Sequence, residues 1–359
     1  MAQFTSESIR FSMDALINSS NKIEYLNQFD EIEFNNIQLL IGSNREFILN
    51  IDEFKVFIDK SINLDYCDDF HIPIICYVCE YGSLDMLQYL KSKGAKLDYT
   101  NEYVHGQPIH YACKEGKLNF VKYLVENGAD VNSADKYGNY PIHYVCHSVD
   151  DTSLDLVKYL VENGANIHCA DCAGYWPIHQ ACYSGDAALN LVKYLIGKGA
   201  DVNCINEKGH TAIQCACFKG DDSLELVKFL ISLNVDIKCI DYEGYNLLHS
   251  ACNRGDKSVK LVKYLLDLGA DVNCATRPIH LACKHVSKPL ELVKVLVENG
   301  ANVNCVDADG RRPIHYACEN RALKIVKYLI GNGAYINGEK NEFIFFSKIK
   351  WRILTFAIN

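Results

Sequence analysis

The sequence lacks long apolar runs. No uncharged stretch reaches the roughly 18–20 residues that a helix needs to cross a bilayer. The first twenty residues carry Glu7, Arg10 and Asp14 and contain no apolar core of the kind that secretory signal peptides have. We therefore expect a protein that neither spans a membrane nor is exported through a signal peptide.

Motifs of the common catalytic sites are also missing. The chain has no Walker-type glycine-rich loop, no G-x-S-x-G elbow, no H-E-x-x-H zinc motif and no D-x-D-x-D-G calcium loop. It therefore offers no positive sign of an enzyme, and we expect no catalytic residue and no cofactor. Detection of stoichiometric zinc would favour the opposite interpretation, an enzyme or metal protein of unusual type.

Positive charge is in deficit as well. The 36 Lys and Arg residues face 45 Asp and Glu residues, which gives a formal net charge of −9. Proteins that bind phosphate backbones need clustered positive charge. Nucleic acid is therefore not an expected partner.

Apolar residues and cysteine are plentiful. Hydrophobic residues make up 49% of the 359 positions, enough to bury a large core. In a short secreted chain, 17 cysteines would suggest a disulfide framework. In a long chain without an export signal they indicate reduced thiols, so we expect the protein in the cytosol or the nucleus.

A short block recurs along the chain. Residues 108–113 read Pro-Ile-His-Tyr-Ala-Cys, residues 141–146 Pro-Ile-His-Tyr-Val-Cys and residues 177–182 Pro-Ile-His-Gln-Ala-Cys. Successive copies of the final Cys lie 34, 33, 36, 35, 35, 31 and 35 residues apart. The eight copies end at Cys79, Cys113, Cys146, Cys182, Cys217, Cys252, Cys283 and Cys318.

Two further blocks complete each cycle. Leu-Val-Lys-Tyr-Leu with Gly-Ala-Asp-Val-Asn follows the first block, as at residues 156–160 and 199–203, and Asp-x-x-Gly closes the cycle, as at residues 135–138. The apolar spacing predicts two short amphipathic helices per repeat, with Pro at the start of the first, while Asp-x-x-Gly predicts a tight hairpin-like turn. Such a unit cannot bury its own apolar face, so the repeats must stack.

On these motifs the sequence closely resembles the ankyrin-repeat family, over about residues 70–337. The resemblance implies an all-α solenoid of eight stacked helix-turn-helix units with hairpin-like loops between them. Residues 35–69 align in character with later repeats and are expected to form a degenerate capping repeat. Residues 1–34 match no pattern we can name. We expect the apolar residues 338–359 to cover the end of the last repeat, with a basic amphipathic membrane-surface helix as the alternative.

The repeats depart from the template in two ways. Five of them, ending at Cys146, Cys182, Cys217, Cys252 and Cys283, carry two or three additional residues between their helices. We expect a longer turn there. The Cys283 repeat lacks Asp-x-x-Gly, because Cys274-Ala275-Thr276 runs directly into Arg277-Pro278. One hairpin should therefore be missing from the row.

Histidine and cysteine are interpreted as structural. Six histidines occupy the same position of the repeat, which we call a template slot. At Gln214 that slot has lost its histidine, which a shared catalytic site would not readily tolerate. The cysteines also fall in template slots too far apart for disulfides. The two C-x-x-C pairs, Cys76/Cys79 and Cys169/Cys172, lie about three repeats apart, so we expect no shared metal. The histidines are His110, His143, His179, His249, His280 and His315.

The resemblance implies a non-catalytic, monomeric scaffold that binds an unknown partner protein through its hairpin tips and concave helix face. The alternative is a substrate-recruiting adaptor of the ubiquitin-ligase type, or a pathogen effector, using the same surface. Tyrosines gather near the tips, although Tyr140 and Trp176, in the family's Thr slot, are expected to pack between hairpins. The positions implied to contact the partner are Lys136, Tyr137, Asn139, His147, Tyr175, Tyr183, Lys208, His210, Phe218, Tyr242, Glu243, Tyr245, Asn253, Arg254, Asp309 and Arg311.

Overall fold

The computed structural model describes residues 22–27, 49–60, 64, 67, 72–98, 106–274 and 277–335. The apolar segment 338–359 and most of residues 1–34 and 35–69 lie outside these ranges, so the expectations for them stay predictions. The chain forms two compact units, residues 1–172 and residues 173–359. Each unit is described by itself.

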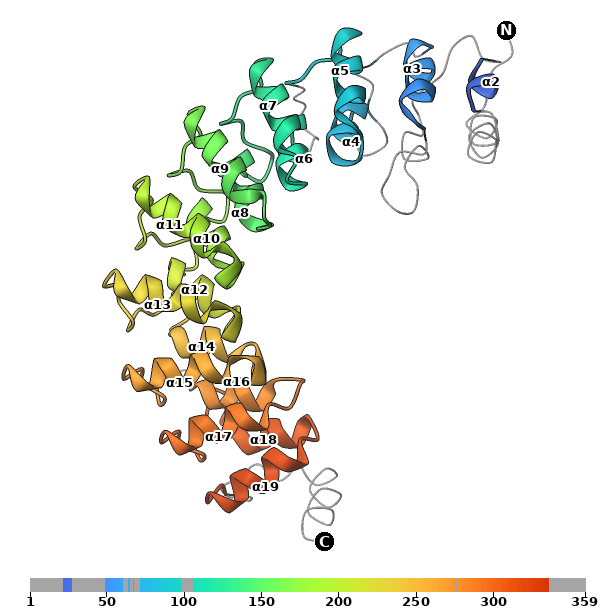
Figure 1. Ribbon diagram of the computed structural model, residues 1–359. Coiled ribbons are helices and arrows are strands. Elements are labelled where there is room, and N and C mark those ends of the chain that lie inside the picture. The colour runs from blue at the N-terminus through green and yellow to red at the C-terminus, as the bar shows by residue number, and fades with distance from the viewer. Residues whose placement is uncertain are drawn as a thin grey trace. The chain divides into compact units, whose positions relative to one another are not determined.

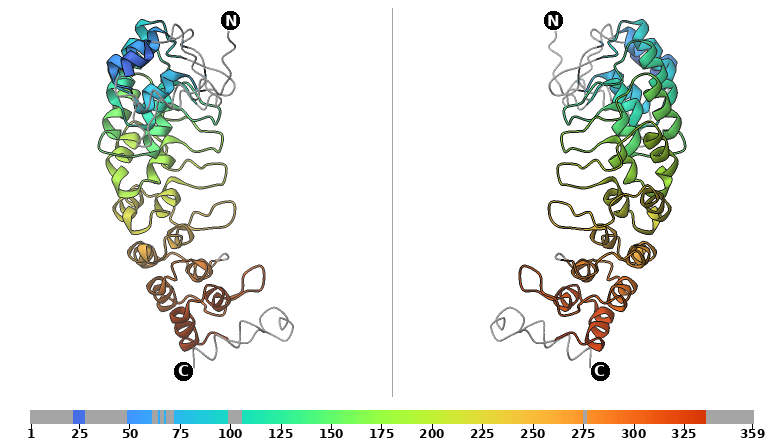
Figure 2. Two further views of the ribbon diagram at one scale, coloured as in Figure 1. Left: turned by 90° about the vertical axis from the view of Figure 1, so that its right-hand side faces the viewer. Right: turned by 90° about the vertical axis from the view of Figure 1, so that its left-hand side faces the viewer.

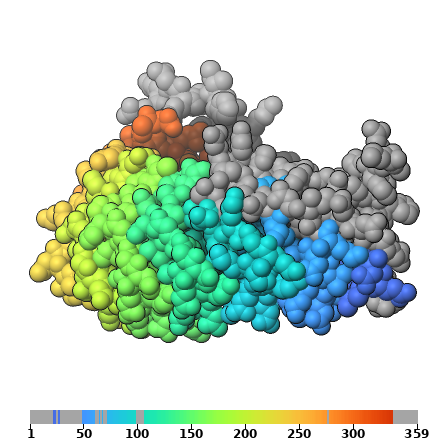
Figure 3. All heavy atoms as spheres, turned by 90° about the horizontal axis from the view of Figure 1, so that it is seen from above, coloured from blue at the N-terminus to red at the C-terminus, as the bar shows by residue number. Residues whose placement is uncertain are grey.

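The first unit is a stack of antiparallel helix pairs (Figure 1). Two helices precede the regular repeats, α2 (Lys22–Leu26) and α3 (Ile51–Asp59). The pairs that follow pack directly against one another, as the cyan to green surface in Figure 3 shows. They are α4 (Ile74–Tyr81) with α5 (Leu84–Ser92), α6 (Pro108–Lys114) with α7 (Leu118–Glu126), and α8 (Pro141–His147) with α9 (Ser153–Glu162).

The second unit continues the same pattern with five more pairs. Three of its pairs have a short 3₁₀ helix between the two α-helices. These are α10 (Pro177–Cys182), η2 (Gly185–Ala188) and α11 (Leu189–Gly197); α12 (Ala212–Cys217), η3 (Gly220–Ser223) and α13 (Leu224–Ser232); and α14 (Leu247–Cys252), η4 (Gly255–Ser258) and α15 (Val259–Asp267). The last two pairs are α16 (Pro278–Lys284) with α17 (Leu290–Glu298) and α18 (Pro313–Glu319) with α19 (Leu323–Gly331).

Within the described ranges the only strand-like pairing consists of two isolated bridges, Cys67 with Pro73 and Ile205 with Thr211. The second of these bridges closes the arms of one hairpin loop. These loops leave the helix pairs on one side within each unit (Figure 2). The predicted all-α solenoid of helix-turn-helix units with hairpin-like loops is thus confirmed.

The repeated apolar residues form the core. In the third regular pair, Ile142 and Cys146 of α8 face Val157 and Leu160 of α9, and all four are completely buried. Burying a side chain of this kind contributes roughly 1.5–3 kcal/mol. Because every pair repeats these positions, each unit has one continuous core along its stack.

The template histidine joins neighbouring repeats. In His179, Nδ1 accepts a hydrogen bond from the Trp176 N–H at 3.1 Å, and Nε2 donates to the Cys204 carbonyl at 3.0 Å. In the Cys217 repeat, where glutamine replaces the histidine, Gln214 makes the same two bonds: Oε1 accepts from the Thr211 N–H, and Nε2 donates to the Tyr245 carbonyl, both at 3.0 Å. Glutamine therefore replaces histidine without losing the connection, which agrees with the structural interpretation of this slot.

The lengthened turns also join repeats. Asp186, in η2, accepts hydrogen bonds from the Glu225 and Leu226 N–H groups at 3.3 and 2.7 Å. These amides belong to the first turn of α13, in the next repeat, where helical N–H groups lack a partner within the helix. Asp221 and Asp256 repeat the arrangement toward the first turns of α15 and α17. In these three repeats, the additional residues thus supply an N-terminal cap to the following repeat.

Candidate functional site

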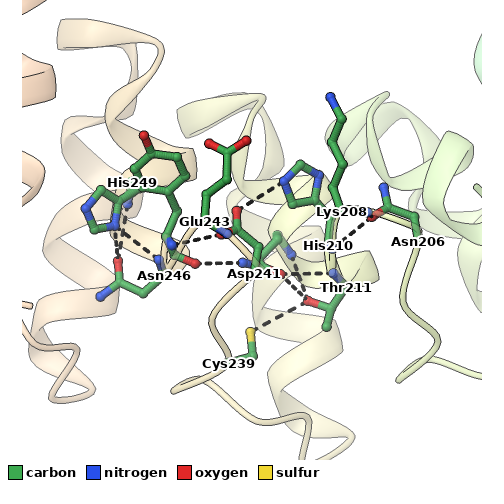
Figure 4. A network of polar contacts seen from close by, with 11 residues as sticks. Asn206, Lys208, His210, Thr211, Cys239, Asp241, Glu243, Asn246 and His249 are labelled. Atoms are coloured by element: carbon green, nitrogen blue, oxygen red, sulfur yellow. Dashed lines mark hydrogen bonds and ion pairs between the residues drawn. The ribbon is translucent and has the colours of Figure 1, made fainter. Parts of the chain in front are cut away.

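The hairpin tips, which we call fingers, are residues 135–139, 171–175, 206–210, 241–245 and 307–311. In finger 241–245, the Asp241 N–H donates to the Tyr245 carbonyl at 3.0 Å, and Asp241 Oδ1 accepts from the Glu243 and Tyr245 N–H groups, both at 2.9 Å (Figure 4). Asp135, Asn206 and Asp307 make equivalent bonds in their own fingers. One side-chain oxygen therefore fixes the whole tip.

Neighbouring fingers of one unit are hydrogen-bonded edge to edge. In the second unit, the Glu207 N–H donates to the Ala173 carbonyl at 3.2 Å, and the Tyr242 N–H donates to the Lys208 carbonyl at 3.0 Å. Gly209 has φ +79°, and a Cβ there would lie 2.9 Å from the Tyr242 ring. The glycine is therefore needed both for the turn and for the close approach of the next finger.

A polar network ties fingers 206–210 and 241–245 together from inside. His210 Nε2 lies 3.2 Å from Asp241 Oδ2, and the Asp241 side chain is buried (Figure 4). Gln214, in helix α12 of the same repeat as His210, holds the Tyr245 carbonyl as described above. The two fingers are thus positioned as one rigid pair.

An aromatic row crosses the inner helices of the second unit; we call the first helix of each pair inner and the second outer. The ring centroids of Tyr175 and Tyr183 are 6.0 Å apart, those of Tyr183 and Phe218 are stacked at 5.8 Å, and those of His210 and Phe218 meet at 5.7 Å. All four residues are half-buried. Burial, with the nearby Cys215 and Tyr175, raises the pKa of the Tyr183 phenol, which stays protonated. The row presents neutral aromatic faces and edges.

The residues predicted to contact a partner fall into two groups. Asn139, Tyr175, Tyr183, His210, Phe218, Tyr245 and Arg311 are half-buried. The others are exposed, with Tyr137 at 51% and Tyr242 at 72% of their maximal surface. The exposed group is Lys136, Tyr137, His147, Lys208, Tyr242, Glu243, Asn253, Arg254 and Asp309.

Some of the half-buried residues are engaged within the protein. Asn139 Nδ2 lies 3.3 Å from Asp135 Oδ2, so it supports its own finger. Arg311 Nη1 donates to both carboxylate oxygens of Glu319, at 3.0 and 3.1 Å. The Tyr245 ring packs on the His249 ring at 5.0 Å. Such residues shape the surface and offer only part of their side chain to a partner.

Sequence reasoning missed one set of exposed residues. Ile205, Ile240 and Val306 each directly precede the first residue of a finger, and they are 48%, 63% and 40% exposed. The preceding cysteines of this arm, such as Cys204 and Cys305, are buried. In an extended segment, successive side chains point to opposite sides. The buried cysteine followed by an apolar residue was therefore the sequence signal that could have identified these exposed residues.

The chemistry of the described residues is uniform. No group of three or more His, Cys, Asp or Glu side chains among them is arranged to hold a metal ion, and none of the cysteines forms a disulfide. Burial raises the pKa of the template thiols well above their usual range, as at Cys217 and Cys252. Within the same described part, no helix has the length and apolar character of a membrane span.

Comparisons with known proteins agree with the repeat pattern. A family model for ankyrin repeats in three copies matches residues 46–135, 75–171, 109–204 and 178–276, and a second model, for many copies, matches residues 279–330. The crystal structure of the human ASB11 ankyrin repeat domain is similar, with a TM-score of 0.54 and 27% sequence identity; the match covers 65% of this chain and 100% of that one. Among curated proteins, none matches this chain.

Proposed function

Because the chain belongs to the ankyrin-repeat family, whose repeats generally mediate protein–protein interactions, we propose that it is a non-catalytic scaffold that binds a partner protein. The contact surface is formed by the fingers and the adjoining ends of the inner helices. We further propose that the protein is a monomer of the cytosol or nucleus and does not bind nucleic acid, in keeping with its acidic charge and free thiols.

One observation carries the proposal. The second unit combines a rigid pair of fingers, with Lys208, Tyr242 and Glu243 exposed at their tips, and the half-buried aromatic row described above. Exposed tyrosine and arginine on a rigid framework are typical of residues that dominate binding energy at interfaces. A pre-formed surface also lowers the entropic cost of association.

Affinity capture from cell extract tests this surface. Bait protein would be compared with a variant carrying Tyr137→Ala, Tyr242→Ala and Arg254→Ala, all at exposed positions. A control variant carries Leu233→Ala and Leu268→Ala, which remove exposed apolar side chains at the ends of outer helices α13 and α15. Circular dichroism would check that both variants fold.

We expect partners captured by the wild type and the control to be lost by the finger variant, by about tenfold or more if two hot spots are removed. Equal capture by all three proteins would contradict the proposed surface. Ubiquitin-ligase components among the proteins lost would favour the adaptor alternative over a simple scaffold.

A further inference from the structure

The turns that join inner to outer helices in the second unit carry an excess of positive charge. Residues 218–223, 253–258, 285–289 and 320–322, together with Lys284 at the end of α16, make up what we call the turn row. The turn row contains three aspartates and six cations, in a chain whose formal net charge is −9. The cations are Lys219, Arg254, Lys257, Lys284, Lys288 and Arg321.

Direct contacts join each turn to the next, so the turn row is continuous. The 3₁₀ helices η2, η3 and η4 contact one another in this order. His285 Nε2 donates a hydrogen bond to the Asn253 carbonyl at 3.0 Å, and Asn320 Nδ2 donates to the Lys284 carbonyl at 2.7 Å. These turns follow the C-terminal ends of the inner helices, whereas the fingers precede their N-terminal ends. The turn row and the fingers are therefore separate surfaces.

Glycine in one turn gives room to the cation of the next turn. Gly185 has φ +68°, and a Cβ there would lie 2.9 Å from Cγ of Lys219 in the following repeat. Gly220 has φ +71°, and a Cβ there would lie 3.2 Å from Cβ of Arg254. The stems of both cations therefore pack closely over the backbone of the preceding turn, which restricts the positions that their charged groups can take.

The cations of the turn row have no acidic partner in the part of the chain that the structure describes. None of the six forms an ion pair there. Two lysines of the outer helices differ, because Lys228 pairs with Glu225 and Lys294 with Glu291, both at 2.8 Å. Five of the six cations are exposed and Lys219 is half-buried, so their charges are available to a partner.

Two of the three aspartates in the turn row are engaged by the backbone. Asp221 and Asp256 accept hydrogen bonds from amides of α15 and α17, at 2.9 and 3.0 Å. Their negative charge therefore lies against the positive ends of these helices. Asp222 is the remaining acid of the turn row and is exposed. The surface that the turn row offers is thus predominantly positive.

We propose that the turn row binds an acidic, extended segment of a partner protein, with a carboxylate at about every third residue. This inference rests on the proposed function and specifies the chemistry of a second contact with the partner. Packed helices lie about 8–10 Å apart, which sets the spacing of successive turns. In polyproline II, three residues complete one turn at about 3.1 Å each, so every third side chain lies on the same face about 9 Å further on. One carboxylate can therefore meet the cations of each turn.

Other anionic partners fit the turn row less well. Duplex DNA carries one negative charge per roughly 1.7 Å, so some of its phosphates would lie beside Asp222. The acidic remainder of the protein also repels a long polyanion, whereas a short segment contacts the turn row alone. In a β-strand successive side chains alternate between two faces, so every third residue points away from the surface.

A synthetic probe tests the proposal with the full-length protein. The probe is a fluorescein-labelled peptide of four Glu-Pro-Gln triplets, a composition that favours polyproline II. An isomer with its four glutamates adjacent has the same charge and a different spacing. Binding would be followed by fluorescence anisotropy up to roughly 1 mM. We expect saturable binding of the triplet peptide, and at least about threefold weaker binding of the isomer.

A charge variant locates the contact. It carries Lys219→Gln, Arg254→Gln and Lys288→Gln, which keep much of each stem and remove one charge from each of three turns. The triplet peptide should bind this variant about tenfold more weakly than the wild type. The difference should shrink at high salt, because these charges are near the surface.

The matched control removes the same number of charges elsewhere in the unit. It carries Lys193→Gln, Lys260→Gln and Lys263→Gln, at exposed positions of outer helices α11 and α15. We expect it to bind the triplet peptide as the wild type does. If the variant at Lys219 does not fold, the double variant Arg254→Gln with Lys288→Gln, both exposed, replaces it.

Three results would overturn the inference: equal binding to the turn-row variant and the control, equal binding of the two peptides, or no saturable binding. Displacement of the peptide by a twelve-nucleotide thymidine strand, at a lower concentration than unlabelled peptide requires, would assign the turn row to nucleic acid and also overturn it. Capture of a partner that depends on the fingers, with no binding of the triplet peptide, would refute this inference and leave the proposed function standing. Loss of both would refute the two together.

Discussion

Asp221 should stabilise the repeat that follows it. Its Oδ1 accepts a hydrogen bond from the Leu261 N–H at 2.9 Å, and Leu261 is the third residue of α15. The local residue that would normally cap this helix, Ser258, instead donates its hydroxyl to the Gly255 carbonyl at 2.6 Å. Asp221→Ala therefore leaves an amide in the first turn of α15 without an acceptor.

The magnitude follows from the cap and the charge. Replacing a capping Asp by Ala costs typically about 1 kcal/mol, and loss of a carboxylate beside a helix N-terminus adds about 0.3–1 kcal/mol. We expect Asp221→Ala to destabilise α15 and its neighbours by about 1–2 kcal/mol. Asp221→Asn keeps an acceptor but loses the negative charge, so it should cost only the charge contribution of about 0.3–1 kcal/mol.

Hydrogen exchange is the suitable assay, because repeat stacks need not unfold in one step. A loss of about 1.4 kcal/mol corresponds to a tenfold faster exchange of α15 amides. The adjacent Asp222 is exposed and caps no helix among the described residues, so Asp222→Ala is a matched control. Equal acceleration by Asp221→Ala and Asp222→Ala would refute the cap and leave only a general charge effect.

Three other predictions concern the template slots. Gln214→His should keep both inter-repeat bonds and change stability by less than about 0.5 kcal/mol, whereas Gln214→Leu should cost about 2–4 kcal/mol in urea unfolding, because two groups lose their partners. Burial lowers the pKa of His280 below its ordinary 6.5. As the pH falls, His280 is therefore protonated in the unfolded chain before it is protonated in the folded protein. Its contribution to the free energy of unfolding is complete above about pH 6.5 and decreases at lower pH. His280→Gln should reduce the pH dependence of the free energy of unfolding between about pH 7 and pH 5. Among the described cysteines, the exposed Cys172 should be alkylated first at neutral pH, while buried Cys217 reacts after unfolding; mass spectrometry of labelled peptides that finds equal rates would contradict this.

The repeat architecture was predictable because its causes are local. Spacing of Ile, Ala and Cys along the inner helix and of Val and Leu along the outer helix marks the core directly. The lengthened turns were visible as additional residues, but their role was not. Asp186, Asp221 and Asp256 cap helices about 36–40 residues further along the chain, and only the stacked structure shows which amide each carboxylate reaches.

The sequence assigned the candidate contact residues to positions of the repeat, but it could not give the exposure of their side chains. The resemblance placed Tyr183 and Phe218 at contact positions, yet their rings stack on each other across two repeats and are half-buried. Tyr242 occupies the same position in its finger as Glu207 does in the preceding one. It is far more exposed than Tyr183 or Phe218. The exposure of each such side chain depends on the residue in the same slot of the neighbouring repeat, which a template aligned within one repeat does not contain.

This dependence on neighbours also concerns the repeat that lacks Asp-x-x-Gly. At a regular repeat, the edge of each finger is covered by the next, as Gly209 is covered by Tyr242. Finger 241–245 has a regular neighbour on one side, joined through Tyr242 and Lys208, and on the other side faces the repeat that lacks a finger. It is held rigidly by Asp241 and His210. The part that a residue plays at this surface therefore depends on the neighbouring repeat as much as on its position in its own repeat.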